Sequence, residues 1–274
     1  MDGRKRIELG AVQETLLIPL YARALESVRP HPMLVDDAAV DLVRSIDYDF
    51  ARFGRGPSIV GCVLRSTIFD EWVRAFLRRS PGGTVVEIGA GLNTRFERLD
   101  NGSAHWVEFD LPDVMALRQE LLADGDRRTR LAASVVEDGW VDAVLAHPGP
   151  YFLVSEAVLL YLAEPDVRTA LGHVADRLPG ASIAFDTAGP LMMRTQDQHD
   201  TLRHLSARMQ WTCADPREVQ ALEPRLRLVE SRGLGDVPRH VMSARPLRRR
   251  LGPRAVGLTS LATRYRMNLF DVTG

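Results

Sequence analysis

The sequence predicts an α/β protein in which a doubly wound, mostly parallel sheet follows an N-terminal helical cap. Apolar residues recur at helical spacing through the first 80 residues, and after Thr84 short β-rich runs alternate with helical intervals. A glycine-rich turn follows the first of these runs. Strands that alternate with helices normally form parallel sheets with right-handed crossovers. We expect one domain, with residues 1–80 as the cap and residues 81–274 as a ligand-binding core that ends in substrate or lid elements.

The helical cap is expected from apolar positions that lie three or four residues apart. They are Leu16, Leu17, Leu20, Ala24 and Leu25, then Ile59, Val63, Leu64, Ile68, Trp72, Val73 and Phe76. Gly54, Gly56 and Pro57 favour a break in the chain, so the last helix should stand apart from the earlier ones.

Short runs rich in β-branched and aromatic residues predict the strands of the core. They cover residues 84–88, 105–109, 151–155 and 182–186, with a weaker run near residues 131–135. Helices are expected at residues 112–123, 139–146 and 165–178. Beyond Asp186 the pattern predicts helices near residues 195–209 and 216–222 and a strand at residues 227–231.

Composition is that of an ordinary globular protein and argues against several function classes. Hydrophobic residues make up 45% of the sequence, charged residues make up 26%, and the formal net charge is -1. A nearly neutral chain has no global attraction to nucleic acid. The arginine run ARPLRRRLGPR, at residues 244–254, keeps a nucleotide- or nucleic-acid-binding protein as a distant alternative, although such a run is more often a solvated loop or a subunit contact. We expect no nucleic-acid partner, and homo-oligomerisation stays open.

Signals for export, membrane insertion and metal binding are sparse. The N-terminus lacks an apolar h-region, and the run YFLVSEAVLLYLA is too short to span a bilayer. Cys62 and Cys213 are too few for a disulfide framework and lack zinc-ligand spacing. His199 and His204 are five residues apart, which does not place two ligands on one helical face. We expect a cytoplasmic protein with no membrane contact and no metal.

The turn after the first strand predicts a nucleoside site. In a doubly wound sheet, ligands bind beyond the carboxyl ends of the strands, where the strand order reverses. Gly89, Ala90 and Gly91 occupy this place, and glycine allows the backbone to approach a ligand closely. Asp110 closes the next strand 19 residues after Gly91, a spacing typical of an acid that hydrogen-bonds ribose hydroxyls. Glu108, two residues earlier on the same strand face, competes with Asp110 for this role.

The form of the turn favours one nucleoside over another. NAD or FAD would prefer GxGxxG, and Thr94 occupies the third glycine position, so an NAD-dependent oxidoreductase is the weaker interpretation. An ExGxG turn suits S-adenosylmethionine better, because this ligand has no pyrophosphate and places its amino-acid moiety over the glycine loop.

Four motifs in order, LRSTIFDEWV, EIGAGLNTRFERL, VEFDLPDV and SEAVLLYL, resemble the leucine carboxyl methyltransferase family. The sequence is most similar to the bacterial branch typified by the tetracenomycin polyketide O-methyltransferase, and the resemblance covers most of residues 8–190. It implies a class I methyltransferase with a Rossmann-like core over residues 81–274 and S-adenosylmethionine as its cofactor.

The resemblance also implies which residues hold the two ends of the cofactor. At the methionine end it places Arg65 on the carboxylate, with Asp70 either orienting Arg65 or capping a charged face. It places Glu156 beside the α-ammonium group, which would supply the partner that a buried carboxylate needs. At the adenine end, Ser134 stands where an aspartate is common, and Val135 is expected to cover the ring.

The acceptor is expected to be a carboxylic acid. Tyr161 resembles a family tyrosine near the acceptor site and is the candidate catalytic residue. A carboxylate is already ionised at neutral pH, whereas a phenol with a pKa near 10 would need a base, and no histidine stands in a recognisable base motif. The resemblance therefore implies a methyl ester on an aromatic polyketide in antibiotic biosynthesis. Methylation of a phenolic hydroxyl on a similar scaffold is the alternative.

The acceptor pocket is expected between the N-terminal helices and the segment after Asp186. Four apolar residues of that segment are candidates to line a slot for a flat aromatic body: Leu191, Met192, Met193 and Trp211. One arginine among Arg23, Arg52 and Arg194 would orient the acceptor carboxylate.

Overall fold

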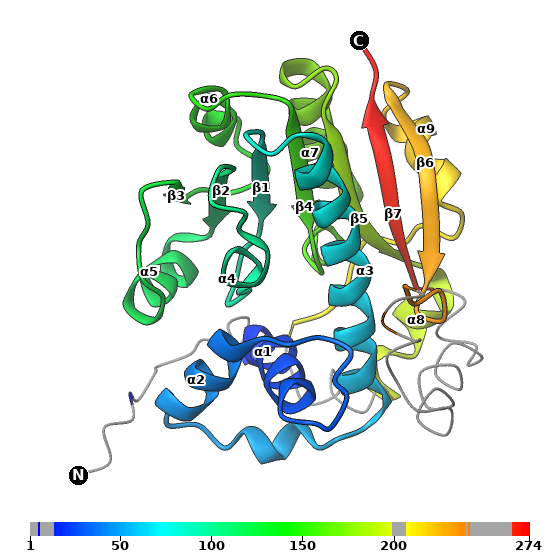
Figure 1. Cartoon of the computed structure of the whole chain (residues 1–274). Helices are drawn as coiled ribbons and strands as arrows, with labels where there is room; N and C mark the ends of the chain where they lie inside the picture. Colours follow the sequence, from blue (N-terminus) through cyan, green and yellow to red (C-terminus); the bar gives the residue numbers. More distant parts are fainter. Residues whose placement is uncertain (1–4, 6–13, 199–206, 239–240, 242–264) are drawn as a thin grey trace.

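The computed structural model describes residues 5, 14–198, 207–238, 241 and 265–274. Before the sheet the chain forms α1 (Glu14–Ser27), α2 (Asp37–Ser45), the 3₁₀ turn η1 (Phe50–Phe53) and the long α3 (Pro57–Arg79). Pro57 begins α3, where the N–H that proline lacks has no partner within a helix. Figure 1 shows α1 and α2 beyond the carboxyl ends of the parallel strands, while α3 runs along the sheet.

The core contains a seven-stranded sheet in the order β3-β2-β1-β4-β5-β7-β6. Its strands are β1 (Thr84–Ile88), β2 (His105–Asp110), β3 (Arg128–Ala132), β4 (Tyr151–Ser155), β5 (Ser182–Ala188), β6 (Leu226–Gly233) and β7 (Tyr265–Val272). The first five strands are parallel, and β7 pairs antiparallel with both β5 and β6. The chain order reverses at β1, which lies between β2 and β4, so the doubly wound prediction is confirmed.

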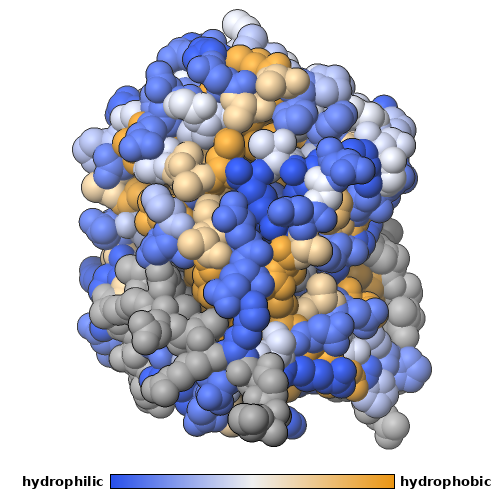
Figure 2. Space-filling model, turned by 90° about the vertical axis from the view of Figure 1, so that its left-hand side faces the viewer, coloured by the Kyte–Doolittle hydropathy of each residue, from blue (hydrophilic) through white to orange (hydrophobic). Residues whose placement is uncertain are grey.

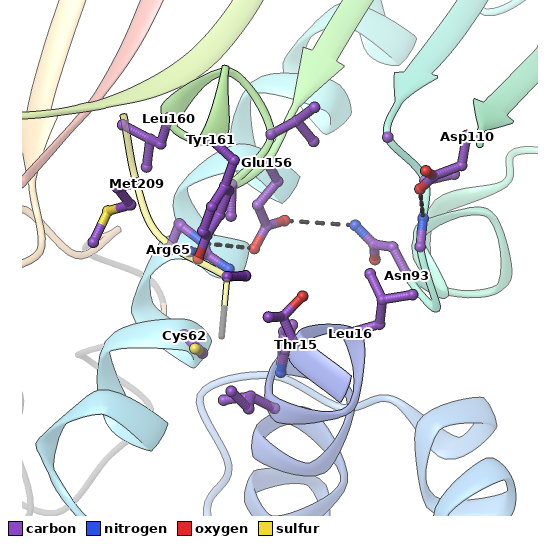
Figure 3. Close-up of a pocket in the computed structure, with 18 of the residues that line it drawn as sticks. Thr15, Leu16, Cys62, Arg65, Asn93, Asp110, Glu156, Leu160, Tyr161 and Met209 are labelled. Atoms are coloured by element: carbon purple, nitrogen blue, oxygen red, sulfur yellow. Dashed lines mark hydrogen bonds and ion pairs between the residues drawn. The ribbon is translucent and has the colours of Figure 1, made fainter. Parts of the chain in front are cut away.

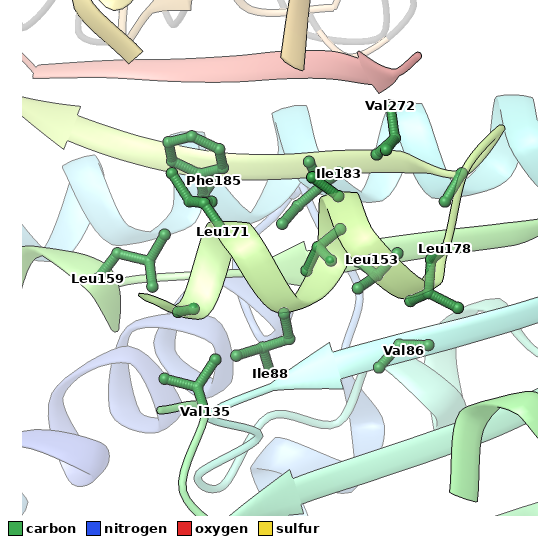
Figure 4. Close-up of a cluster of buried hydrophobic side chains, with 14 of the residues drawn as sticks. Val86, Ile88, Val135, Leu153, Leu159, Leu171, Leu178, Ile183, Phe185 and Val272 are labelled. Atoms are coloured by element: carbon green, nitrogen blue, oxygen red, sulfur yellow. The ribbon is translucent and has the colours of Figure 1, made fainter. Parts of the chain in front are cut away.

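Helices cover both faces of this sheet. Between and after the strands lie α4 (Arg95–Leu99), α5 (Pro112–Leu121), α6 (Gly139–Leu145), α7 (Glu164–Arg177), α8 (Pro190–Arg194) and α9 (Val219–Leu222). On one face, Val86 and Ile88 of β1 pack with α6 and α7 (Figure 4). On the other, Val85 packs with Phe69 and Trp72 of α3. Alternate side chains of β1 thus pack into the hydrophobic clusters on opposite faces of the sheet, as the two-residue period of a strand requires.

Two predicted elements are wrong in position or extent. The strand expected at residues 131–135 is β3, which begins at Arg128, because Arg128 and Arg130 extend onto a buried carboxylate of β2. β3 lies at the edge of the sheet that faces the viewer in Figure 2, and the surface on that side is mainly hydrophilic, with apolar areas between polar residues. The helix expected at residues 195–209 is absent from the described part of that range, which holds the 3₁₀ turn η3 (Gln196–Gln198) and an irregular segment at residues 207–210.

The final strand, β7, was not predicted from the sequence. It pairs with β5 from Ser182↔Asp271 to Ala188↔Tyr265, and β6 pairs on its other side. Its residues alternate imperfectly, because Tyr265, Met267, Asn268 and Phe270 are all buried. Pairing with two strands far away in the sequence, rather than a local pattern, selects the extended conformation of this segment.

Candidate functional site

A cavity of about 760 Å³ lies between the carboxyl ends of β1, β2 and β4 and the helices α1 and α3, of which the first half lines it (Figure 3). It brings together all the residues that were predicted to bind the cofactor, and the candidate catalytic tyrosine. They are Arg65, Gly89, Ala90, Gly91, Asp110, Ser134, Val135, Glu156 and Tyr161. A volume of several hundred cubic ångströms is typical of small-molecule sites.

The glycine turn is held by hydrogen bonds to the neighbouring strand. Gly89 and Gly91 have positive φ angles of 64° and 47°, which glycine adopts without strain. The Ala90 N–H donates to the Phe109 carbonyl at 3.0 Å, and the Gly91 N–H donates to Asp110 Oδ2 at 2.8 Å (Figure 3). The carboxylate of Asp110 therefore organises the turn while it also lines the cavity. Burial raises its pKa above the usual range despite these contacts.

Glu108 does not share the role of Asp110. Its carboxylate is fully buried outside the cavity and accepts from Arg118 Nη2 at 2.6 Å and from Arg128 Nε at 2.7 Å. Arg130 adds a longer contact of 3.3 Å. Burial acts to raise the pKa of Glu108, but Arg118 and Arg128 outweigh it and lower the pKa to about 2. This carboxylate is a structural anchor for β3 and α5.

The wall next to Asp110 is apolar except for one hydroxyl. Val135 is buried there, and Ser134 Oγ accepts from the Val136 N–H at 3.3 Å. Phe109, Leu111, Val114 and Ala133 complete this wall. It offers flat apolar contact beside a carboxylate, which suits a nucleoside base and its ribose.

The opposite end of the cavity holds Arg65 and Glu156 as an ion pair. Arg65 Nε donates to Glu156 Oε1 at 2.9 Å, and the same oxygen accepts from Ser66 at 2.8 Å (Figure 3). Glu156 Oε2 accepts from Arg95 Nη2 at 2.6 Å and from Asn93 Nδ2 at 3.5 Å. Burial opposes ionisation, but Arg65 and Arg95 dominate and lower the pKa of Glu156 to about 2. Glu156 is therefore a carboxylate at neutral pH.

Arg95 and Tyr265 are site residues that sequence reasoning missed. Arg95 is fully buried, and its Nη1 donates to both carboxyl oxygens of Glu87 at 2.7 Å. Tyr265, from β7, lines the cavity and accepts from Arg65 Nη1 at 2.9 Å. The position of Arg95 in the helix after the glycine turn could have indicated it. Nothing local in the sequence indicated Tyr265.

Asp70 does not orient Arg65. It accepts from Arg95 Nε at 2.8 Å and from Arg98 Nε at 3.0 Å, and it is completely buried. Arg98 also donates to Asp36 at 2.8 Å, so a continuous chain of ion pairs joins the loop before α2 to the glycine turn. Breaking such a buried pair leaves an uncompensated charge, and this chain therefore couples the cap to the site.

Tyr161 ends the 3₁₀ turn η2 (Leu159–Tyr161) and lies beside Arg65 on the cavity wall (Figure 3). Its hydroxyl donates to none of the described residues. Burial raises the pKa of Tyr161 to about 12, although Arg65 opposes the shift. The hydroxyl is therefore protonated at neutral pH and can donate a hydrogen bond to a ligand.

The expected acceptor residues are only partly in place. Met192 lines the cavity, whereas Trp211 is buried in the core on the α7 face. Arg23 reaches the cavity but donates to Asp36 at 2.8 Å and to the Leu92 carbonyl at 2.9 Å. The remaining candidates do not line the cavity: Leu191, Met193, Arg52 and Arg194. Arg52 instead pairs with Glu14 at the surface, because α1 and η1 meet there.

Within the described ranges, no three His, Cys, Asp or Glu residues are grouped so that they could hold a metal ion. In the same ranges, no helix is long and apolar enough to cross a membrane. His199, His204 and the arginine run at residues 244–254 lie outside the described residues.

Comparison with known proteins agrees with this geometry. The family model for leucine carboxyl methyltransferase matches residues 17–175. The tetracenomycin polyketide synthesis O-methyltransferase of Streptomyces glaucescens is 33% identical over 263 residues, which cover 95% of this chain and 97% of the relative. An S-adenosyl-L-methionine-dependent methyltransferase of Gibberella zeae is 27% identical over 248 residues, with 82% and 83% coverage.

Among solved structures, a DUF574 family protein from Streptomyces avermitilis superimposes with a TM-score of 0.59 and 14% identity, and the match covers 93% of this chain and 97% of that protein. This likeness concerns the fold. The family match and the extended identity together show that the chain belongs to the leucine carboxyl methyltransferase family of S-adenosylmethionine-dependent methyltransferases.

Proposed function

We propose that the protein forms a methyl ester on the carboxyl group of an aromatic polyketide. The observation that carries this proposal is the cavity itself, in which an end suited to a nucleoside joins a largely apolar chamber, with no histidine among the described residues that line it. The relative from Streptomyces glaucescens, named for tetracenomycin polyketide synthesis, supports the substrate class.

The residues present fit S-adenosylmethionine, which supplies an electrophilic methyl group on a sulfonium. We assign Asp110 to the ribose hydroxyls and Ser134 and Val135 to the adenine. Arg65 takes the carboxylate of the amino-acid moiety, and Glu156 takes its ammonium group. All of these residues line the cavity.

Binding of the ammonium group requires one change at Glu156, because each of its oxygens already accepts two hydrogen bonds. The contact from Asn93 Nδ2 is the longest of the four at 3.5 Å, and hydrogen bonds of this length are weak. We infer that the Asn93 side chain moves away from Glu156 and that the ammonium group takes its place as hydrogen-bond donor.

The acceptor chamber is built from apolar side chains of the cap and the C-terminal part of the core. Its lining includes Leu16, Ile18, Pro19, Leu160, Leu162, Met192, Met209 and Leu234. Two methionines among them can adapt to a large flat ring system, because their side chains are unbranched and flexible.

The ionisable groups around the chamber favour an acceptor that arrives already charged. Among the described lining residues there is no histidine, and burial raises the pKa of both Tyr161 and Tyr265, so neither phenol can accept a proton at neutral pH. Alignment of two reactants can lower a barrier by roughly 7 to 11 kcal/mol without acid or base catalysis. A carboxylate is already ionised at neutral pH and needs no base, and Tyr161 can hold it by donating its hydroxyl hydrogen.

Ester formation can be tested with methyl-labelled S-adenosylmethionine and an aromatic polyketide acid. We expect the product to release labelled methanol in mild alkali, because an ester hydrolyses there and a phenol ether does not. Label retained in an alkali-stable product would assign the reaction to a phenolic hydroxyl. An acceptor whose carboxyl is replaced by a primary amide serves as the control and should not be methylated.

Replacement of Asp110 by asparagine should weaken S-adenosylhomocysteine binding by about 1.5 to 3 kcal/mol, the usual contribution of a hydrogen bond to a charged group. Calorimetry measures the effect. Asp113→Asn is the matched control, because Asp113 lies three residues away at the start of α5 but does not line the cavity. Equal affinity of the two variants would contradict the ribose assignment.

A further inference from the structure

Asp186 of β5 and Tyr265 of β7 contact the residues assigned to the cofactor, but the proposed function gives neither of them a role. Asp186, near the end of β5, is fully buried and accepts the Ala157 N–H through both oxygens at 3.0 Å. It also accepts the hydroxyl hydrogen of Tyr265. Tyr265 in turn accepts from Arg65 Nη1 at 2.9 Å.

Through these contacts Asp186 acts on both members of the ion pair, the Glu156 carboxylate and the Arg65 guanidinium. Ala157 directly follows Glu156 and has a positive φ of 59°, a conformation that is unfavourable for alanine. The bonds from Asp186 to its N–H hold the backbone of this turn. The bond from Tyr265 holds the guanidinium of Arg65, whose Nε is taken by Glu156. Among the described residues, Nη2 of Arg65 has no hydrogen-bond partner.

The Tyr265 hydroxyl also bridges Arg65 and a second carboxylate, that of Asp186, which forms a longer ion pair with the guanidinium. Arg65 Nη1 lies 3.7 Å from Asp186 Oδ2, beyond hydrogen-bond distance, because the Tyr265 hydroxyl bridges the two groups. Burial raises the pKa of Tyr265 well above its usual range, so this bridge stays neutral. Among the described residues, Arg65 therefore hydrogen-bonds one carboxylate, that of Glu156, and its Nη2 remains available for a carboxylate of a ligand.

We propose that Tyr265 and Asp186 are positioning residues that set the orientation of Arg65 and Glu156 toward the amino-acid end of the cofactor. This inference rests on the assignment of Arg65 and Glu156 in the proposed function. Neither Tyr265 nor Asp186 needs to touch the reacting atoms.

The test compares two ligands that differ in the amino-acid moiety alone. S-adenosylhomocysteine carries it, whereas 5′-methylthioadenosine has a methyl group in its place. We expect Tyr265→Phe to weaken S-adenosylhomocysteine binding by about tenfold to 150-fold, as the loss of a hydrogen bond to a charged group predicts. The affinity for 5′-methylthioadenosine should change less than twofold. In steady-state kinetics, KM for S-adenosylmethionine should rise more than kcat falls.

Tyr151→Phe is the matched control, because its hydroxyl donates to the His147 carbonyl at 2.9 Å at the opposite end of the sheet. It should leave both affinities within twofold of the wild type. Asp186→Asn is the second variant, and it should show the same loss confined to S-adenosylhomocysteine, because the neutral amide oxygen accepts the Tyr265 and Ala157 hydrogens more weakly than a carboxylate does.

Three results would overturn the proposal. If both variants bind S-adenosylhomocysteine as tightly as the wild type does, Tyr265 and Asp186 have no positioning role, while the assignment of Arg65 and Glu156 stands. If both ligands bind equally more weakly, the substitutions have caused a general structural defect, and the positioning role is wrong. If the wild type did not prefer S-adenosylhomocysteine over 5′-methylthioadenosine, the assignment of Arg65 and Glu156 would fail, and the proposal would fall with it.

Discussion

Replacement of Glu108 by glutamine is expected to lower the free energy of unfolding by about 3 to 5 kcal/mol, the usual cost of removing one partner from a buried ion pair. The variant leaves Arg118, Arg128 and Arg130 packed around an uncharged amide. Their side chains are at most 4% exposed, so water cannot replace the lost charge. Urea denaturation monitored by circular dichroism measures the change.

Glu97→Gln is the matched control, because Glu97 also pairs with Arg128, at 2.6 Å, but is 24% exposed. Exposed pairs contribute at most about 1 kcal/mol, so this variant should remain close to the wild type. A Glu108 variant as stable as the Glu97 variant would contradict the anchoring role of Glu108. Affinity for S-adenosylhomocysteine, measured on folded protein, should respond to Asp110→Asn more than to Glu108→Gln.

The same carboxylate should contribute to the acid sensitivity of the fold. The pKa of Glu108 is about 2 in the folded protein, below its ordinary value of 4.5. A lowered pKa stabilises the folded state fully above the unfolded value, and this stabilisation is lost as pH falls through the folded value. The unfolding free energy of the wild type should therefore drop between pH 4.5 and 2. The drop should be smaller in Glu108→Gln, which has no carboxylate to protonate.

Replacement of Gly89 by alanine is the second large effect, with an expected loss of about 2 to 5 kcal/mol in unfolding free energy. A positive φ costs an alanine about 1 to 2 kcal/mol, and overpacking adds about 1 to 3 kcal/mol. A Cβ at this position would lie 2.2 Å from Val158 Cγ2. The loop after β4 therefore restricts this position, and relief of the clash must displace the turn on which Asp110 acts.

Gly102→Ala separates the two contributions. Gly102 has a positive φ of 76°, but a Cβ there would meet no atom within 4 Å. This control should lose only the backbone cost, about 1 to 2 kcal/mol. Adding Val158→Ala to the Gly89 variant should recover part of the stability, because it removes both γ carbons. Equal losses at the two glycines, with no recovery, would show that the clash with Val158 is unimportant.

The sequence by itself determined the architecture and the place of the site. The change from helical spacing to alternating strands and helices at Thr84 is a local pattern, and so is the glycine turn that follows β1. The carboxyl ends of parallel strands meet at one edge of a sheet, so residues that follow β1, β2 and β4 had to face one cavity. This is why the sequence could predict that Gly89, Asp110 and Glu156 lie at one cavity.

The tertiary structure alone decided which charged groups pair. Glu108 and Asp110 lie two residues apart on one strand, yet Glu108 is enclosed by arginines of β3 and α5 while Asp110 faces the cavity. Tyr265 meets Arg65 across 200 residues. In a chain with 35 basic and 36 acidic residues, spacing along the sequence cannot select the partners. Ion pairing depends on distances of a few ångströms, and these exist only after remote segments have packed together.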